Sequence, residues 1–555
     1  MDKINEKHNL FERNILALAR PGISADTTLC SRLSGAETTL NRYKFLDSPS
    51  GEIIPAWVDQ SGLAHPLHSM VDPMREARRL METLKDDGFV ILLGLGGGFY
   101  AEAALEQKNT SLVLVIDYDI NSIAELLCYR DYIKIFNDPR FHFLADPPPH
   151  LIEEYITGIY QPILCGGIRT LPLRGRTSGD NQTFTNARLA IENAIHRVSA
   201  DYSVQAYFGL RWFGNIIRNI KQAAKNDSPL PPIRKVAVTA AGPSLDSQIK
   251  IIREKRNTFF LIAADTSLPS LLSQGITPDS VVAIDCQHIS YYHFMSGLPK
   301  ETILFMDLAG PPLAASLTDK IRFFSGNHPL TSYICREWRA LPEVDTSGGN
   351  VTYASIALAE RLGAESIELY GADFSYPMGL SYARGAYIHP FFEKKQMRLA
   401  PLESQHSAFL YRGPLNKKTS ETGWYYESPS LTFYRERLEE KCKTMTSKLL
   451  PQRGSGAPIQ IPSGVNKPKP ERILSLFNSG KCLMEADEFL LSYKEDIASL
   501  SVSAIHSIKG KEKQVFTTLL PAAAAIKHRN PGLSVNELLE KTKAHCIGEI
   551  EKVLG

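Results

Sequence analysis

The stretch Lys235-Val-Ala-Val-Thr-Ala-Ala-Gly242-Pro243-Ser244-Leu-Asp246 decides the fold class of this chain. An apolar run rich in β-formers breaks at Gly-Pro-Ser and then takes on a helical pattern. A strand delivers the chain in this way to the N-terminus of a helix, where backbone N–H groups face an anion. The stretch therefore predicts a cradle for the phosphate of a nucleotide.

Further apolar runs follow the first one, and helical patterns separate them. The candidate strands are Val236–Ala240, Phe259–Ala263, Val281–Ile284, Ile303–Met306, Ile321–Phe324 and Ile367–Tyr370. Alternation of this kind predicts a parallel sheet flanked by helices. We therefore expect an α/β protein whose central, Rossmann-like domain spans residues 232–430.

At 555 residues the chain is too long for a single core. Turn residues between short apolar runs predict a small β-rich cap over residues 1–70. A second Rossmann-like domain is expected over 71–182, with a helix from Asp72 to about Leu84, and a helical connector over 183–231. A Pro/Gly/Ser linker at 454–470 and a break at Asn530-Pro531-Gly532 interrupt an otherwise mostly helical C-terminal domain, 431–555.

Composition narrows the class of protein. The chain is 43% hydrophobic and 22% charged with a net charge of +2, so its overall field indicates neither nucleic acid nor an anionic membrane as partner. Its eight cysteines form no C-x-x-C pair and are typical of reduced thiols. The polar N-terminus indicates no secretory signal, and no apolar run of about 18 residues predicts a membrane span. We expect a cytoplasmic protein.

A glycine turn marks the second Rossmann-like domain. The strand Phe89–Leu93 runs into Gly94, Gly96 and Gly98, and Asp117 ends the next strand. In one interpretation the glycines approach a cofactor and Asp117 binds a ribose. In the other the turn simply needs small residues. We favour the second, because no other residue commits this domain to methyl or hydride chemistry.

Polar residues and glycines follow the central strands and should meet at one edge of the sheet. Asp265 and Asp285 are each expected either to accept hydrogen bonds from a ribose or base, or to cap a helix. The turn before the helix Val351–Leu362 offers N–H groups to a phosphate. The residues expected at this edge are Gly242, Pro243, Ser244, Asp265, Asp285, Gln287, Ser347, Gly348, Gly349, Asn350, Asp373 and Phe374.

Several of these motifs resemble the motility-associated factor (Maf) family of flagellin glycosyltransferases. They are Ala241–Leu245, Ile262–Thr266 with Gly275–Asp279, Asp285–Gln287 and Gly371–Phe374, joined by His68–Ala77 and Gly94–Asp117 in the N-terminal part. The resemblance covers most of residues 1–440. It implies transfer of a sugar to Ser or Thr of flagellin, which would be the protein partner.

The central domain is also similar to bacterial sialyltransferases that use CMP-sialic acid. The shared motifs are Gly242–Leu245, Thr346–Gly348, Gly371–Phe374 and Ser381–Ala383. This resemblance implies a CMP-activated nonulosonic acid, such as pseudaminic or legionaminic acid, as donor. It implies that Tyr382 contacts the nucleotide phosphate and that a downstream histidine is the base, either His389 or His406, with His288 and His293 ranked below them.

Such a transfer inverts the anomeric centre when the acceptor hydroxyl attacks directly. The leaving phosphate needs N–H and hydroxyl donors. The central domain has no Asp-x-Asp motif of the kind that holds Mg²⁺, so we expect no metal and no cofactor beyond the sugar donor. Arg384 either pairs with the sugar carboxylate or is a solvated loop charge.

Two other functions remain open. The core is similar to archaeal 6-hydroxymethylpterin pyrophosphokinases, which use ATP and Mg²⁺; Asp265, Asp285 and Asp373 would then hold the metal. As the second alternative, the chain is a flagellin-binding assembly factor with a degenerate nucleotide site. The helical tail could bind the acceptor or form a homo-oligomer.

Overall fold

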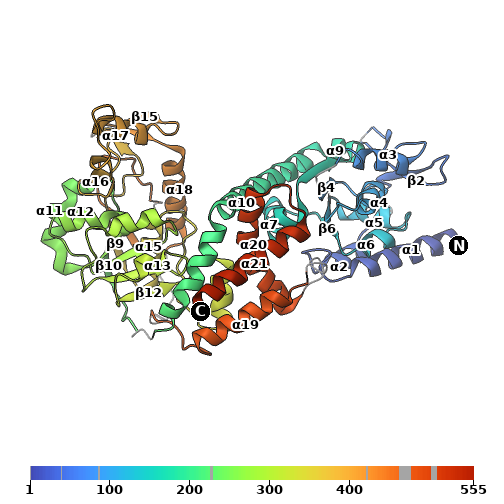
Figure 1. Cartoon of the computed structure of the whole chain (residues 1–555). Coiled ribbons are helices and arrows are strands. Elements are labelled where there is room, and N and C mark those ends of the chain that lie inside the picture. Colours follow the sequence, from blue (N-terminus) through green and yellow to red (C-terminus); the bar gives the residue numbers. More distant parts are fainter. Residues whose placement is uncertain are drawn as a thin grey trace. The chain divides into compact units, whose positions relative to one another are not determined.

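The structure, a computed structural model, describes residues 2–38, 41–59, 61–84, 88–225, 229–420, 423–461, 477–501 and 509–555. The chain divides into two compact units, Met1–Gln205 (unit 1) and Ala206–Gly555 (unit 2). Both contain a parallel sheet covered by helices, as Figure 1 shows. The predicted α/β class with Rossmann-like sheets and a helical C-terminal region is confirmed.

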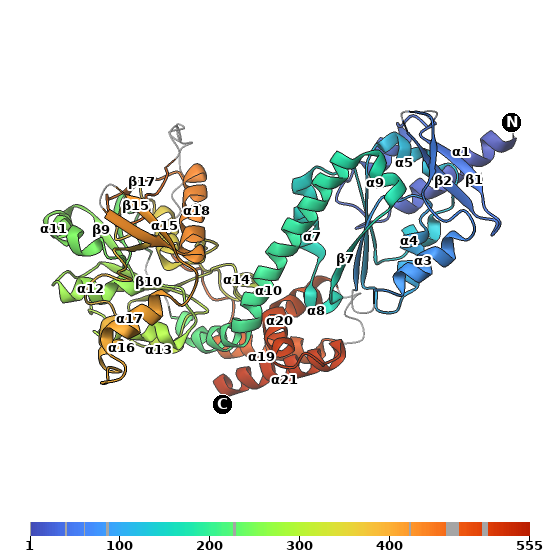
Figure 2. The same ribbon diagram turned by 90° about the horizontal axis from the view of Figure 1, so that it is seen from above.

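Unit 1 is built around a four-stranded parallel sheet of order β6-β5-β4-β7. Its strands are β4 (Phe89–Leu93), β5 (Leu112–Asp117), β6 (Phe141–Ala145) and β7 (Ile168–Pro172). Helices α7 (Pro149–Ile159) and α10 (Asn181–Ala223) pack on one face of the sheet (Figure 2). The other face packs against α3 (Pro73–Met81), α4 (Phe99–Glu106), α5 (Ile120–Leu127) and α6 (Ile133–Phe136). The short helices α8 (Pro162–Cys165) and α9 (Arg174–Gly179) flank β7.

The first part of unit 1 is less β-rich than expected. Helices α1 (Asp2–Leu18) and α2 (Leu29–Ser34) precede a three-stranded antiparallel sheet of β1 (Tyr43–Asp47), β2 (Ile53–Val58) and β3 (Ala64–Pro66). Phe11, Ile15 and Leu18 recur at helical spacing and pack on the core of unit 1. The prediction of a β-rich cap over residues 1–70 is therefore wrong for its first half.

Unit 2 contains a seven-stranded parallel sheet of order β12-β11-β10-β9-β8-β13-β17. Its strands are β8 (Lys235–Thr239), β9 (Phe260–Ala264), β10 (Ser280–Ala283), β11 (Ile303–Asp307), β12 (Ile321–Phe324), β13 (Ser366–Tyr370) and β17 (Lys448–Pro451). The first six are the predicted strands. The seventh, β17, comes from the region expected to be helical, so the central sheet continues beyond residue 430. A short edge strand with one buried residue carries too little apolar signal to be recognised.

Helices cover this sheet and position its loops. Helices α15 (Val351–Arg361) and α18 (Pro429–Thr444) pack on one face (Figure 1). The remaining helices are α11 (Leu245–Lys255), α12 (Leu268–Ser273), α13 (Pro312–Ala315), α14 (Pro329–Glu337), α16 (Ile388–Glu393) and α17 (Leu402–Leu410), with 3₁₀ turns η1 (Arg256–Thr258), η2 (Asp265–Ser267) and η3 (His288–Phe294). A small sheet has the strand order β14 (Tyr376–Pro377), β16 (Gly423–Glu427) and β15 (Asn416–Ser420), and its strands come between β13 and α18 in the sequence.

The C-terminal helices are α19 (Ala486–Ser499), α20 (Gly510–Arg529) and α21 (Val535–Leu554). The last two are separated at the predicted break, Asn530-Pro531-Gly532. Of the predicted linker 454–470, residues 462–470 lie outside the described residues, whereas the N–H of Ala457 donates to the Asp373 carbonyl at 2.9 Å. Among the described helices, none is long and apolar enough to cross a membrane.

Candidate functional site

The direction of the chain through the sheet of unit 2 reverses between β8 and β13. From β8 the chain builds β9 to β12 on one side, and it then returns to place β13 and β17 on the other. Ligands of open parallel sheets bind beyond the carboxyl ends of the strands at such a switch point. We call this edge of the sheet the rim.

Helix α15 begins at the rim. It ends at Arg361, and β13 starts at Ser366 on the edge where the strands begin. The first turn of α15 therefore lies on the opposite edge, where the strands end. Its free N–H groups and the positive end of its dipole lie at the rim.

Gly242, Ser244 and Asp373 come together at the switch point. The Ser244 N–H and hydroxyl donate to the Asp373 carboxylate at 2.8 and 2.5 Å, and the Ser244 hydroxyl accepts from the Ser455 N–H at 2.7 Å. Burial raises the pKa of Asp373, which is 4% exposed, and these hydrogen bonds oppose the rise. Because both Asp373 oxygens are bound by Ser244, this carboxylate supports the rim instead of facing a ligand.

The neighbours of this group are also structural. A Cβ on Gly242 would lie 2.4 Å from Asp373 Oδ2, so only glycine fits there. Pro243 is partly buried in the same turn. Phe374 has a φ of 43° and belongs to the hydrophobic core of unit 2.

Asp265, His293 and Tyr387 form a second group, after β9. Asp265 is 3% exposed, and its Oδ1 lies 3.7 Å from Nδ1 of His293. The His293 ring stacks on Tyr387 with centroids 4.6 Å apart, and its Nδ1 has no hydrogen-bond partner within the described part of the chain. Burial raises the pKa of Asp265 to about 7 and lowers that of His293 to about 4. Near neutral pH, Asp265 titrates and His293 is uncharged.

The next two strands also end in carboxylates. Asp285 accepts from the N–H of Gln287 at 2.9 Å and from its side-chain amide at 3.3 Å, so it caps the turn into η3. Asp307, after β11, is 7% exposed and accepts from the Ala309 N–H at 2.8 Å. Burial raises the pKa of Asp307 to about 6. The capping interpretation of Asp285 therefore agrees with the structure.

The turn 346–350 leads into α15. Asn350 caps the helix by accepting from the Tyr353 N–H at 3.0 Å. Gly348 is packed against the Tyr353 ring, since a Cβ there would lie 2.2 Å from that ring. Gly349 has a φ of 72°. The Ser347 N–H donates to Asp345 at 3.0 Å, so this group is already satisfied.

A segment carrying aromatic and histidine side chains, residues 381–410, follows the rim; we call it the lid segment. The Ala383 N–H donates to the Ala241 carbonyl at 2.9 Å, which fixes the segment on the end of β8. His389 in α16 and His406 in α17 lie with ring centroids 5.4 Å apart. Burial lowers the pKa of His406, and His389 lowers it further. The two histidines that the sequence could not rank are thus neighbours.

Tyr382, near the start of the lid segment, packs against two other rings of the segment. Its ring centroid is 6.1 Å from that of Tyr387 and 6.2 Å from that of Phe409. Burial raises its pKa, and Tyr387, Tyr376 and Asp265 add to the rise while Arg412 opposes it. The hydroxyl is therefore protonated at neutral pH and can donate a hydrogen bond.

Arg384 does not lie in this aromatic cluster. Its side chain is 89% exposed, and its Nε lies 3.8 Å from the carboxylate of Asp246 in α11. The structure therefore favours the interpretation of Arg384 as a solvated loop charge.

Two residues that we did not predict also belong to the site. Tyr434 of α18 lies 3.3 Å from the position a Cβ would take on Gly349. Burial raises its pKa, with Asp285 adding to the rise and Arg412 opposing it. Arg412 itself lies over the Phe409 ring, 4.2 Å from its centroid. Both residues lie outside the shared motifs, so no sequence signal indicated them.

Within the described residues, no three side chains of histidine, cysteine, aspartate or glutamate lie close enough together to hold a metal ion. Asp265 and Asp285 lie at the ends of the neighbouring strands β9 and β10. Magnesium commonly takes one or two carboxylates plus substrate phosphates and water. Both oxygens of Asp285 accept from Gln287 and both oxygens of Asp373 accept from Ser244, whereas Asp265 accepts from the Thr266 N–H on one oxygen, so Asp265 is the best suited of the three.

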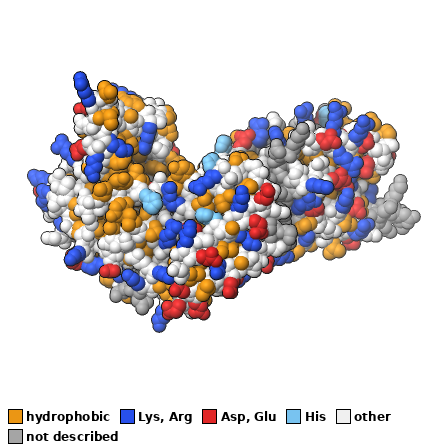
Figure 3. Space-filling view, viewed as in Figure 1, with side chains coloured by type: hydrophobic (Ala, Val, Ile, Leu, Met, Phe, Trp, Pro, Cys, Tyr) orange, Lys and Arg blue, Asp and Glu red, His pale blue; other side chains and the backbone are white. Residues whose placement is uncertain are grey.

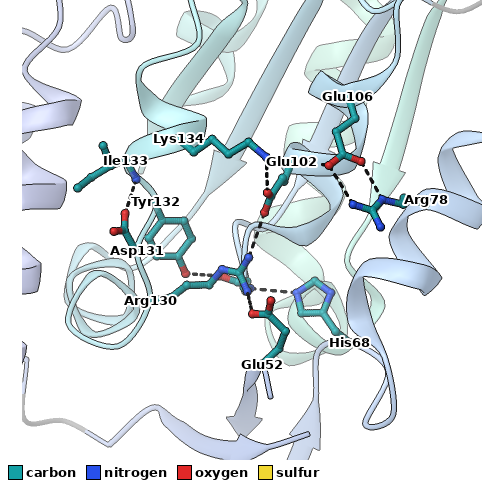
Figure 4. Close-up of polar contacts among 12 residues, drawn as sticks. Glu52, His68, Arg78, Glu102, Glu106, Arg130, Asp131, Tyr132, Ile133 and Lys134 are labelled. Carbon is teal, nitrogen blue, oxygen red and sulfur yellow. Dashed lines mark hydrogen bonds and ion pairs between the residues drawn. The ribbon is translucent and has the colours of Figure 1, made fainter. Parts of the chain in front are cut away.

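In unit 1, the chain's own side chains fill the glycine turn. A Cβ on Gly96 would lie 2.5 Å from Leu173 and 2.7 Å from His68 Nε2. The Gly97 N–H donates to His68 Nε2 at 3.0 Å, and the Tyr132 hydroxyl donates to the Gly96 carbonyl at 2.6 Å. Figure 4 shows the side chains of His68 and Tyr132 on either side of Arg130. Backbone groups that would face a cofactor phosphate are bound internally.

A partly exposed charge cluster lies beside this turn. Figure 4 shows Arg130 between Glu52 and Glu102, at distances of 2.9 and 3.2 Å. Its guanidinium also stacks on Phe99, 3.7 Å from the ring centroid. Burial and the charge of Arg130 lower the pKa of His68 to about 3, so His68 stays neutral and accepts the Gly97 hydrogen bond.

Asp117 is fully buried and cannot bind a ribose in this structure. It accepts from Arg176 Nε at 3.1 Å, from the Tyr118 N–H at 2.8 Å and from the Leu95 N–H at 2.7 Å. Burial raises its pKa and Arg176 opposes the rise. The glycine turn thus has the structural role that we favoured.

The chain is similar to several known proteins. A model of the family "6-hydroxymethylpterin diphosphokinase MptE-like" matches residues 213–379. An uncharacterised protein of Treponema pallidum (strain Nichols) is 30% identical over 164 residues, which cover 29% of this chain and 78% of that protein. This chain belongs to the same family as that Treponema protein. A second uncharacterised Treponema pallidum protein is 32% identical over 152 residues, 27% of this chain and 54% of its own length, so the match spans about half of that relative.

A solved structure resembles the whole chain. It is the Maf glycosyltransferase from Magnetospirillum magneticum AMB-1, with a TM-score of 0.54, 13% identity, and coverage of 99% of this chain and 91% of that chain. The two proteins share a fold. The resemblance to the Maf family inferred from the motifs is thus confirmed at the level of the fold.

Proposed function

We propose that this protein is a glycosyltransferase that moves a nonulosonic acid from a CMP donor to Ser or Thr of flagellin. The Maf glycosyltransferase fold supports the reaction class. The observation that supports the proposal most is that the α15 turn, with Tyr434 against it, and the lid segment that carries Tyr382 both lie at the rim. We propose the cytoplasm as its location, as the composition indicates.

The reaction requires stabilisation of the departing CMP. Negative charge grows on its phosphate as the glycosyl carbon takes on oxocarbenium character. N–H groups at the start of α15 and the protonated hydroxyl of Tyr382 are suited to bind that phosphate. These groups are preorganised, because Asn350 caps the helix.

The acceptor hydroxyl needs a base. A neutral histidine accepts its proton as attack proceeds, an effect typically worth about 10²- to 10⁴-fold in rate. His389 and His406 lie side by side, and burial keeps the pKa of His406 below its usual value. Direct attack by the hydroxyl would invert the anomeric centre.

The surface around the lid segment suits a polypeptide acceptor. Hydrophobic side chains gather over the part of unit 2 that carries α16 and α17 (Figure 3). Leu399 is 93% exposed, and Met397 and Leu380 are more than half exposed. Exposed apolar patches mark interaction surfaces, and a protein acceptor such as flagellin would cover this one.

The test combines binding and transfer. Calorimetric titration of the full chain with CMP is expected to show binding without added metal, and mass spectrometry should detect nonulosonate on flagellin. Tyr382→Phe, His389→Ala and His406→Ala should each be assayed, with a fall of about 10²-fold or more expected for the base. Flagellin binding without transfer by the wild-type protein would favour the assembly-factor alternative and contradict the proposal.

The MptE-like match keeps a pyrophosphokinase as second candidate. In that reaction Asp265 and Asp285 would share Mg²⁺ with the phosphates of ATP. Binding of ATP that requires Mg²⁺, with no affinity for CMP, would favour this function over glycosyl transfer.

A further inference from the structure

Arg412 is exposed, like Arg384, and has no ion-pair partner among the described residues. It follows α17, and its guanidinium lies over the Phe409 ring, 4.2 Å from the centroid. Arg384, by contrast, lies 3.8 Å from Asp246. The two arginines belong to the same region of sequence, but only Arg412 contacts the aromatic cluster.

A row of rings connects Arg412 to the rim. Phe409 lies against Tyr382, Tyr382 lies against Tyr387, and Tyr387 stacks on His293. His293 ends the row 3.7 Å from Asp265. Arg412 and Asp265 therefore stand at opposite ends of one aromatic row, with a permanent positive charge at the lid end and a carboxyl that titrates near neutral pH at the rim end.

The guanidinium of Arg412 is near enough to three tyrosines to affect their ionisation. Burial raises the pKa of Tyr382, Tyr387 and Tyr434, and the charge of Arg412 opposes the rise in each. Tyr434 contacts the α15 turn, where the phosphate would bind. An anionic group next to that phosphate would thus meet Arg412, whereas Asp265 and Asp285 would repel it from the rim end.

We propose that Arg412 binds the carboxylate of the acidic sugar donor, an inference that rests on the proposed function. A planar guanidinium pairs with a carboxylate through two parallel hydrogen bonds. The donor carries two anionic groups, and the structure offers two separate positions for them: the α15 N-terminus for the phosphate and Arg412 for the carboxylate. The acidic sugar would be distinguished from a neutral one at this position.

Calorimetry on the full chain tests this assignment with CMP, CMP-N-acetylneuraminate, CMP-pseudaminate and the methyl esters of both donors. Arg412→Ala should weaken binding of the better donor by about 10- to 100-fold and leave CMP affinity within about twofold. The donor affinity of Arg412→Lys should fall between those of wild type and Arg412→Ala. Arg384→Ala is the matched control and should change neither affinity. For wild type, esterification of the donor should weaken binding by the same factor as Arg412→Ala weakens binding of the free acid. Arg412→Ala should bind the acid and the ester equally well.

Other outcomes overturn the proposal in distinguishable ways. Equal weakening of CMP and donor by Arg412→Ala would place Arg412 at the phosphate or give it a structural role. Unchanged donor affinity in that variant, or equal binding of acid and ester by wild type, would remove the carboxylate contact while leaving glycosyl transfer intact. Failure of wild type to bind CMP and both donors would contradict the proposed function itself. Melting temperatures of all variants show whether they are folded.

Discussion

Gly242 is the residue on which the packing of the switch point depends. A Cβ there would lie 2.4 Å from Asp373 Oδ2 and 2.5 Å from the Gly371 carbonyl, both held in place by hydrogen bonds. We expect Gly242→Ala to lower the free energy of unfolding by about 2 to 4 kcal/mol, because backbone or a buried carboxylate must move. Urea denaturation measures this. Gly413→Ala is the control, since no atom lies within 4 Å of its Cβ position; equal effects of the two changes would contradict the argument.

The buried carboxyl of Asp265 makes stability depend on pH. Its pKa is about 7 in the folded protein, above the value of about 4 in the unfolded chain. The stability contributed by the neutral carboxyl is therefore full below about pH 4 and is lost as the pH rises through 7. As the pH rises from 4 to 8, the unfolding free energy of Asp265→Asn should increase by about 2 to 4 kcal/mol relative to that of wild type. Denaturation at several pH values tests this, and a constant difference would refute the raised pKa.

At the scale of elements, the second half of α10 holds the rim loops in place. The Asn215 amide donates to the carbonyls of Cys286 and Ala309, and the Asn219 amide donates to those of Leu308 and Gly310, all at 2.9 to 3.1 Å. These loops follow β10 and β11; Asp285 lies two residues after the end of β10, and Asp307 is the last residue of β11. The predicted helical connector therefore also positions the loops of the site.

Removal of one of these amides should loosen the rim. Asn219→Ala leaves two buried carbonyls without their donor, so we expect a loss of about 1 to 3 kcal/mol in unfolding free energy. The affinity of Asn219→Ala for CMP, measured by calorimetry, should also be lower than that of wild type. Lys221→Ala, on the same helix with its side chain 46% exposed, should change stability by no more than about 0.5 kcal/mol. A fully stable Asn219→Ala variant would show that the rim loops do not depend on α10.

At the scale of the whole molecule, two parallel sheets are used differently. The turn after β4 in unit 1 is filled by His68, Leu173 and Tyr132, and Asp117 is paired with Arg176. Unit 2 instead has Arg412, which follows the lid segment, lies over the Phe409 ring and has no ion-pair partner among the described residues. We expect calorimetry on the full chain to show no binding of S-adenosylmethionine or NAD, while CMP binds. Saturable binding of either cofactor would contradict the filled turn.

The sequence by itself determined the α/β class, six strands of the central sheet and the residues at their ends, because buried parallel strands are continuous apolar runs followed by turns. It also indicated the motifs shared with the Maf fold. Only the tertiary structure decided which polar groups are already satisfied. Asp373 is bound by Ser244, 129 positions earlier, and Asp117 by Arg176, 59 positions later. It likewise separated Arg412 from Arg384 and added the edge strand β17. Whether a side chain faces a ligand or a partner depends on contacts between distant segments, and local patterns in the sequence do not record such contacts.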